Sequence, residues 1–162
     1  MSEKEFNQIV ELHSDALYRF ALKNIKVVEE AQEIVQTAFE KLWLNRNNVN
    51  LEKSKSYLFR VAYNYLIDMI RKQRKEADWT EELEQVPNTE VVEFKDLKRV
   101  IDQALNSLSE AHRNAIMLRD YEGYSYAEIG EIMNITEAQV KVNIFRGRKQ
   151  MQQLLGKMEY YI

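Results

Sequence analysis

Apolar residues recur at steps of three and four along most of the chain, which is the period of one buried face of an α-helix. This pattern predicts a first helix over about residues 3–23 and a second over residues 28–44. The inward stripe of the second helix consists of Ala31, Ile34, Val35, Ala38 and Leu42. Strand-like alternation is hard to find, and the chain has only 4 Gly and 1 Pro, so the predicted fold class is all-α.

Two stretches interrupt the helical period. Residues 45–53, NRNNVNLEK, contain four Asn and predict a loop, after which a third helix is expected to end in the basic run RKQRK at residue 75. Residues 76–93 carry seven carboxylates without helical periodicity, which indicates a flexible acidic linker. From about residue 94 two more helices are expected. The pattern therefore predicts two small helical domains, residues 1–75 and 94–162, joined by the linker 76–93.

The stretch from residue 125 to residue 149 has the outline of a helix-turn-helix. Ser125 with Glu128, and Thr136 with Gln139, both fit the capping box, in which a hydroxyl and a carboxylate or amide satisfy backbone amides at a helix start. Two helix starts eleven residues apart require a tight turn between them. Asn134 stands at that turn, and Asn tolerates a left-handed backbone at modest cost.

The second helix of this motif has an inward stripe formed by Val140, Ile144, Gly147 and Met151, and its opposite side is polar and basic. Amides of Gln and Asn can pair with adenine, and guanidinium groups with guanine, in the major groove. Lysine and arginine on the flanks of the helix would meet phosphates. The candidate duplex-binding set is Gln139, Lys141, Val142, Asn143, Arg146, Arg148 and Lys149. The alternative is a solvated amphipathic helix with no ligand.

The third helix combines aromatic and cationic residues. Arg60 and Asn64 lie on a polar stripe. The aromatic residues Tyr57, Phe59, Tyr63 and Tyr65 share this helix with the basic residues that end it, among them Arg71, Lys72 and Arg74. Stacking aromatics and phosphate-binding cations are the means by which proteins hold single-stranded DNA. The alternative is that the aromatic residues belong to the core.

The outer face of the second helix is mixed polar and aromatic. Gln36 and Glu40 share it with Phe39 and Trp43, a composition enriched at protein–protein interfaces. The alternative is that Phe39 and Trp43 complete the core of the domain.

The composition and charge of the chain restrict the possible classes of function. The net charge of −3 hides an uneven layout, because residues 1–75 have a net charge of +3 and residues 76–99 one of −5. The chain has no Cys and two distant His, so neither a metal nor another cofactor is expected. No pairing of nucleophile with base is found, which argues against an enzyme. Without a signal peptide or membrane span in the pattern, the expected location is cytoplasmic.

Three segments in order resemble the extracytoplasmic-function sigma factors, the small two-domain promoter-recognition subunits of bacterial RNA polymerase. EEAQEIVQTAFEKLW is similar to the polymerase-binding helix of that family, and YLFRVAYNYLIDMIRKQRK to its promoter-melting, minus-ten helix. LSEAHRNAIMLRDYEGYSYAEIGEIMNITEAQVKVNIFRGRKQM is similar to its minus-thirty-five domain. The resemblance covers nearly the whole chain.

The resemblance implies a sigma factor that directs core polymerase to promoters, recognises both elements and helps to melt DNA. Its implied partners are the beta-prime clamp of core polymerase, promoter DNA and an anti-sigma factor, which is often membrane bound. The implied polymerase-binding residues are Glu33, Gln36, Phe39, Glu40 and Trp43. The implied minus-ten residues are Asn47, Asn48, Arg60, Asn64, Arg71, Lys72 and Arg74. The alternative function is that of a stand-alone helix-turn-helix regulator that binds an operator.

Overall fold

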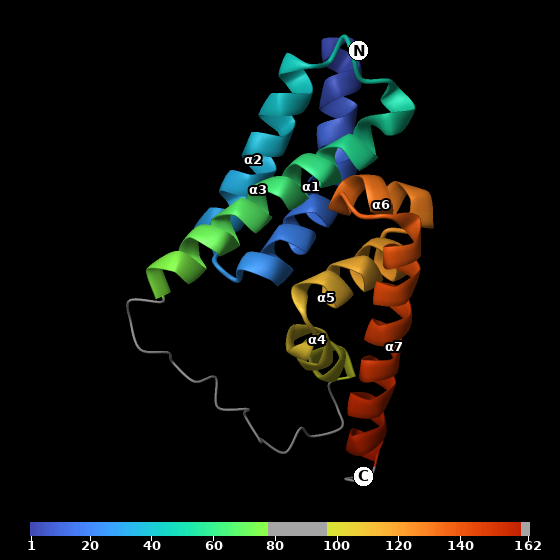
Figure 1. Ribbon diagram of the computed structural model, residues 1–162. Coiled ribbons are helices and arrows are strands. Elements are labelled where there is room, and N and C mark those ends of the chain that lie inside the picture. Colours follow the sequence, from blue (N-terminus) through green and yellow to red (C-terminus); the bar gives the residue numbers. More distant parts are fainter. Residues whose placement is uncertain (78–96, 160–162) are drawn as a thin grey trace.

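The structure, a computed structural model, describes residues 1–77 and 97–159, all in helices, turns and short connections (Figure 1). The first three α-helices are α1 (Glu3–Ile25), α2 (Val28–Leu44) and α3 (Ser54–Ala77), with a short 3₁₀ turn, η1 (Leu51–Lys53), before α3. The other elements are α4 (Leu97–Ser107), α5 (Glu110–Ile116), the π-helical turn η2 (Met117–Tyr121), α6 (Tyr126–Met133) and α7 (Glu137–Glu159).

Helices α1, α2 and α3 form an N-terminal bundle in which each helix packs against the other two. Local sequence defines the ends of α1. A capping box of Ser2 and Glu5 starts the helix, and Lys26 ends it in a left-handed conformation with φ of 61°. The large side chains at the centre of the bundle are completely buried, among them Leu17, Ile34, Leu42, Leu58 and Leu66. Burial of these apolar stripes is the main force that holds the bundle together.

The C-terminal helices pack around α7, which contacts α4, α5 and α6. Ser109 caps α5 by accepting a hydrogen bond from the amide of His112 at 3.3 Å. Gly147 allows α5 and α7 to approach closely, because a Cβ at this position would lie 2.6 Å from Cδ1 of Ile116. In the predicted inward stripe, Val140, Ile144 and Gly147 are buried, and Met151 is half-buried and packs against the small cluster of Leu105, Leu108 and Ile116.

The all-α class predicted from the periodicity is confirmed, and several predicted bounds agree closely with the helices. The second helix has the predicted ends, and α1 extends two residues beyond its predicted end. The third helix also continues two residues further, so that Glu76 and Ala77, assigned to the predicted linker, belong to α3. The rest of that linker, residues 78–93, lies outside the described residues.

One hydrophobic core runs through both halves of the molecule. Helix α3 packs against α1 and α2 on one side and against α6 on the other (Figure 1). The ring of Phe59 in α3 has its centroid 5.3 Å from that of Phe20 in α1 and 5.7 Å from that of Tyr124. Tyr124 directly precedes Ser125, the N-cap of α6, so these edge-to-face contacts join the two halves.

We predict that Gly147→Ala destabilises the C-terminal domain. The new methyl group would meet Ile116 at 2.6 Å, and overpacking of this kind costs about 1–3 kcal/mol, which outweighs the higher helix propensity of Ala. Gly156→Ala on the same helix is the matched control, because its Cβ would meet nothing within 4 Å and should stabilise the helix by about 0.5–1 kcal/mol. Urea unfolding measures both. Equal stabilisation by the two substitutions would contradict the close approach.

Candidate nucleic-acid and protein interface

The helix-turn-helix predicted from the capping pattern is present, with both boxes formed. The Ser125 hydroxyl and the Glu128 carboxylate each accept a backbone hydrogen bond at 3.1 Å. The Thr136 hydroxyl accepts a hydrogen bond from the amide of Gln139 at 3.1 Å, and the Gln139 side chain accepts one from the amide of Thr136 at 2.9 Å. Asn134 adopts the left-handed conformation, with φ of 57° and ψ of 48°. The sequence therefore determines the start of each helix and the turn between them.

Gly130 makes this turn sterically feasible. A Cβ at position 130 would lie 2.9 Å from the carbonyl oxygen of Ile135, closer than such atoms normally approach. The backbone amide of Ile135 in turn donates to the carbonyl of Gly130 at 3.0 Å. Any larger side chain would push the two helices of the motif apart.

The residues predicted to bind duplex DNA all lie on α7 away from its buried stripe. Six of them, Gln139, Lys141, Val142, Arg146, Arg148 and Lys149, are exposed, and Asn143 is half-buried. The side-chain oxygen of Gln139 is engaged in the capping box, which holds this side chain at the start of the helix. These positions extend over about three turns of α7 and include four cations.

Two of these cations have partners on the protein. The guanidinium of Arg148 forms an ion pair with Asp120 at 2.5 Å. The Lys141 ammonium lies 4.0 Å from the Glu137 carboxylate and 5.7 Å from the ring centroid of Tyr126. Hydrogen bonds to Asp120 orient Arg148 along the flank of α7 and raise its pKa. Both cations therefore stand beside the face that carries Arg146 and Lys149.

Sequence reasoning missed one exposed aromatic residue on this face. Phe145 is 69% exposed, and with Val142, at 43%, it forms an apolar strip among the cations. Phe145 also lines a groove of about 700 Å³ together with Tyr126 and Lys141. The sequence does carry a signal for this residue. Phe145 falls on the polar side of the helical period, where a phenylalanine does not contribute to core packing.

A second surface lies on the other half of the molecule, where α1 and α2 form a groove of about 610 Å³. The groove is lined by Glu3, Phe6, Asn7, Val10, Gln36, Phe39, Glu40 and Trp43. The ring of Phe6 in α1 lies 4.9 Å from that of Trp43 and 6.3 Å from that of Phe39, centroid to centroid. Four of the five residues predicted to bind polymerase therefore share this groove, and sequence reasoning missed the contribution of α1.

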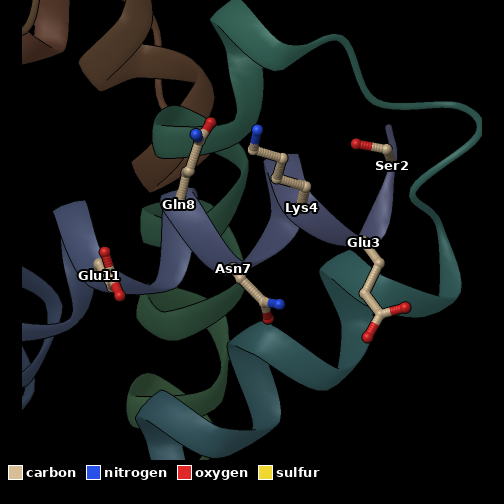
Figure 2. A pocket seen from close by; sticks show the side chains of 6 residues that line it. All are labelled: Ser2, Glu3, Lys4, Asn7, Gln8 and Glu11. Carbon is tan, nitrogen blue, oxygen red and sulfur yellow. The ribbon is translucent and has the colours of Figure 1, made fainter.

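The neighbouring face of α1 is hydrophilic. Figure 2 shows Glu3 and Asn7 on the side of α1 that faces the α2 ribbon, and Lys4 and Gln8 on the opposite side. Glu3 and Asn7 thus form the polar edge of the aromatic groove. Phe39 and Trp43 are half-buried, so they pack onto Phe6 and also remain accessible to a partner.

The fifth predicted residue, Glu33, lies outside the groove. Its carboxylate accepts a hydrogen bond from the hydroxyl of Tyr65 in α3 at 2.7 Å, which raises the pKa of Tyr65. Within the groove, the Gln36 amide donates to the Glu40 carboxylate at 3.3 Å, one helical turn away. The rim of the groove is therefore acidic.

The residues predicted to hold the minus-ten strand are accessible. Asn47 and Asn48 are exposed in the turn after α2, and Arg60, Asn64, Arg71, Lys72 and Arg74 are exposed along α3. The guanidinium of Arg60 lies 5.5 Å from the ring centroid of Tyr57, which keeps a cation beside an aromatic face.

The aromatic residues of α3 differ in accessibility. Phe59 is fully buried and belongs to the core, so it is not available to stack on a base. Tyr57, Tyr63 and Tyr65 are half-buried, and burial raises the pKa of Tyr63 to about 12. Only the tyrosines can therefore contribute an aromatic surface to this face.

Residues 1–77 and 97–159 contain neither a membrane-spanning helix nor a metal-binding cluster. No helix there has the length and hydropathy needed to cross a bilayer. No cluster of three or more His, Cys, Asp or Glu is arranged in those residues to hold a metal ion.

Comparison with known proteins agrees with this architecture. The family description Sigma-70 region 2 matches residues 9–76, and Sigma-70, region 4 matches residues 98–151. The chain is 31% identical to the ECF RNA polymerase sigma factor SigW of Bacillus subtilis, over 93% of this chain and 88% of that protein. It is 28% identical to SigM of the same organism, over 93% of this chain and 95% of that protein.

Solved structures give the same result. The sigma factor RpoE in complex with the anti-sigma factor NepR from Bartonella quintana superposes with a TM-score of 0.78 at 27% identity, covering 94% of this chain and 98% of that one. CnrH in complex with the cytosolic domain of CnrY superposes with a TM-score of 0.69 at 22% identity, over 96% and 90%, and supports the fold.

The fold and the two family matches define a two-part helical promoter-recognition protein. The chain belongs to the sigma-70 family, as a sigma factor of the extracytoplasmic-function group. Its function is that of the family, promoter-specific initiation of transcription with bacterial RNA polymerase, and this family is not a class of enzymes.

Proposed function

We propose that the two halves of the chain divide this function between them. The N-terminal helices α1–α3 bind core polymerase and the minus-ten element, and the helix-turn-helix of α6 and α7 binds the minus-thirty-five element. The observation that supports this division most directly is that the aromatic groove of α1 and α2 and the basic face of α7 are separate surfaces on different halves. We further propose that the protein acts in the cytoplasm, where polymerase acts.

The alternative of a stand-alone regulator accounts for only one of these surfaces. An operator-binding protein needs the helix-turn-helix, but it has no use for a region 2 segment over residues 9–76 with an aromatic groove. The RpoE structure contains the anti-sigma factor NepR, and the CnrH structure contains the cytosolic domain of CnrY. We therefore include an anti-sigma factor, whether soluble or membrane bound, among the proposed partners.

The α1–α2 groove has the features of a protein-docking site. Phe6, Phe39 and Trp43 provide aromatic surface at its centre, and Glu3 and Glu40 provide negative charge at its rim. Aromatic residues surrounded by a polar rim concentrate binding energy at protein interfaces. We assign this groove to the beta-prime clamp of core polymerase.

We predict that Gln36→Ala combined with Glu40→Arg abolishes co-purification with core polymerase. The double substitution removes the 3.3 Å pair and reverses the charge at the rim of the groove. Helical circular dichroism should be unchanged, because both side chains are exposed. The matched control is Gln32→Ala with Glu29→Arg, two exposed positions of α2 that do not line the groove. Undiminished binding by the folded Gln36/Glu40 variant would remove the groove from the polymerase interface.

The exposed face of α3 and the turn after α2 have the features needed to hold an opened strand. Arg60 beside Tyr57 offers a cation and an aromatic ring, and Asn47, Asn48 and Asn64 offer amides for base edges. Extruding a base costs a few kcal/mol, and stacking contributes about 1–3 kcal/mol per base. A small number of such contacts therefore offsets the cost of melting.

Substitutions on this face should impair melting more than duplex binding. We predict that Asn64→Ala, or Asn47→Ala with Asn48→Ala, lowers the permanganate reactivity of promoter thymines in complexes with core polymerase. Binding of the same complexes to closed duplex is the internal control, because it depends on α7. An unchanged permanganate pattern would show that these amides do not hold the opened strand.

On α7, the side chains suited to contact bases lie apart from those suited to contact phosphates. Gln139, Asn143 and Arg146 lie on one side of the helix, and we propose that they read base edges. Lys141, Arg148 and Lys149 are assigned to phosphates. Phe145 and Val142 lie between them and offer apolar contact to thymine methyl groups.

The substitutions Arg146→Ala and Lys141→Ala should therefore change DNA binding in different ways. Losing a bidentate base contact costs roughly 1–3 kcal/mol and relaxes preference at one position, whereas losing a phosphate contact weakens all sequences and reduces the salt slope by about one. Binding of holoenzyme to a randomised minus-thirty-five library at several salt concentrations separates the two effects. If Arg146→Ala lowers affinity uniformly and leaves the preferred sequence unchanged, Arg146 is a phosphate contact.

A further inference from the structure

An exposed ion pair in the C-terminal half holds one of the α7 cations in a fixed direction. The carboxylate of Asp120 accepts hydrogen bonds from Nη2 of Arg148 at 2.5 Å and from Nε of Arg148 at 3.3 Å. Because each bond goes to a different oxygen of one carboxylate, the pair fixes the plane of the guanidinium as well as its position. Asp120 therefore restrains Arg148 more than a single charge contact would.

The backbone that carries Asp120 is itself held in place. Asp120 lies in the π-helical turn η2, in which the amide of Glu122 donates to the carbonyl of Met117 at 3.1 Å. The Arg119 guanidinium donates to the carbonyl of Tyr124 at 2.8 Å and so fastens the end of this turn. Since Met117 is buried, the turn is anchored in the core. Asp120 thus extends from a well-supported segment of the backbone.

Arg148 reaches from this turn to the groove along α6 and α7. The groove of about 700 Å³ is lined by Tyr126, Lys141 and Phe145 as well as by Arg148, whereas Asp120 is not among its lining residues. The carboxylate therefore restrains the guanidinium without occupying the groove. A guanidinium has more N–H donors than one carboxylate engages, so donors of Arg148 remain for a second anion.

The contribution of this pair to folding is small, and its effect on side-chain order is larger. The Arg148 and Asp120 side chains are 49% and 38% exposed, and exposed ion pairs add little to the free energy of unfolding. An arginine that moves freely loses rotamer freedom when it binds a ligand. Pairing with Asp120 imposes this loss before DNA arrives. Arg148 is therefore ordered in advance for binding.

The neighbouring ion pair on α7 lacks this property. Lys141 and Glu137 are one helical turn apart, and their charged groups make one contact at 4.0 Å. Both side chains are more than half exposed. A single long contact to a lysine ammonium does not fix a direction. Glu137 therefore offers a comparison carboxylate that lies on the DNA-binding helix but orders no guanidinium.

We propose that Asp120 is a positioning residue for DNA binding, which holds Arg148 in the direction where its guanidinium meets a phosphate of the minus-thirty-five duplex. This role rests on the proposed function, in which Arg148 is a phosphate contact. The negative charge of Asp120 by itself repels DNA. The two effects of Asp120 on affinity therefore have opposite signs, and positioning is the larger one.

Asp120→Ala should weaken DNA binding although it removes a negative charge. The probe is the duplex that unsubstituted holoenzyme selects from the randomised minus-thirty-five library, measured at several salt concentrations. We expect the affinity to fall roughly two- to tenfold, the cost of ordering one long side chain on binding. The salt slope should fall by up to about one, in the same direction as for Arg148→Ala. The double variant should bind no more weakly than Arg148→Ala alone, because both substitutions act on one contact.

Three further variants separate position from charge. Glu137→Ala removes a carboxylate without releasing a guanidinium, so the affinity should stay unchanged or rise. Arg148→Lys keeps the positive charge but cannot form the pair with two bonds, so the affinity should fall, and Asp120→Ala should cause no further loss in that background. Asp120→Glu keeps a carboxylate and should retain most of the affinity. Urea unfolding of each variant should be nearly unchanged, because the pair is exposed.

The outcomes distinguish this role from the proposed function. A rise in affinity for Asp120→Ala, as for Glu137→Ala, would show that the carboxylate only repels DNA, and Arg148 would remain a phosphate contact. Additive losses for Asp120→Ala and Arg148→Ala would also overturn the positioning role. If Arg148→Ala left both affinity and salt slope unchanged, the phosphate contact itself would be wrong, and the role of Asp120 with it.

Discussion

The packing of Phe59 constrains the whole molecule. Its ring is fully buried between Phe20 of α1 and Tyr124 before α6, so α3 serves as a wall of the core for both halves. A helix that packs on two sides has little surface left for ligands. The residues of α3 that remain exposed, such as Arg60 and Asn64, are confined to one outer face, and this is the face to which we assign the minus-ten strand.

The α1–α2 groove and the exposed side of α7 are likewise the faces that their helices do not bury in the core. Helix α2 buries Ala31, Ile34, Ala38 and Leu42 against its neighbours, which leaves its opposite side to form a groove with α1. Helix α7 buries Val140 and Ile144, and its cations are directed to the remaining sides. Binding surfaces in this small protein are thus the faces that core formation does not use. The interface between the halves is the exception, because polar groups are buried there.

Local signals in the sequence predicted most of the fold. The apolar period located α1 and α2, and the hydroxyl–carboxylate and hydroxyl–amide boxes located the starts of α6 and α7, because these features depend on residues within one or two turns. The groove residue Phe6 and the bonds from Asn24 to α5 could not be predicted in this way. They depend on contacts between residues that are distant in the chain, 90 positions apart for Asn24 and Asn114. Burial of Phe59 was missed for the same reason.

The central claim is that this protein directs core polymerase to promoters and does not act on DNA by itself. The most direct test maps the 5′ ends of transcripts made by purified bacterial core polymerase on genomic DNA of the source bacterium, with and without this protein. The account predicts a set of start sites that appears only when both are present, preceded by two shared sequence elements at constant spacing. Specific binding to DNA without core polymerase, together with an unchanged set of start sites, would contradict it.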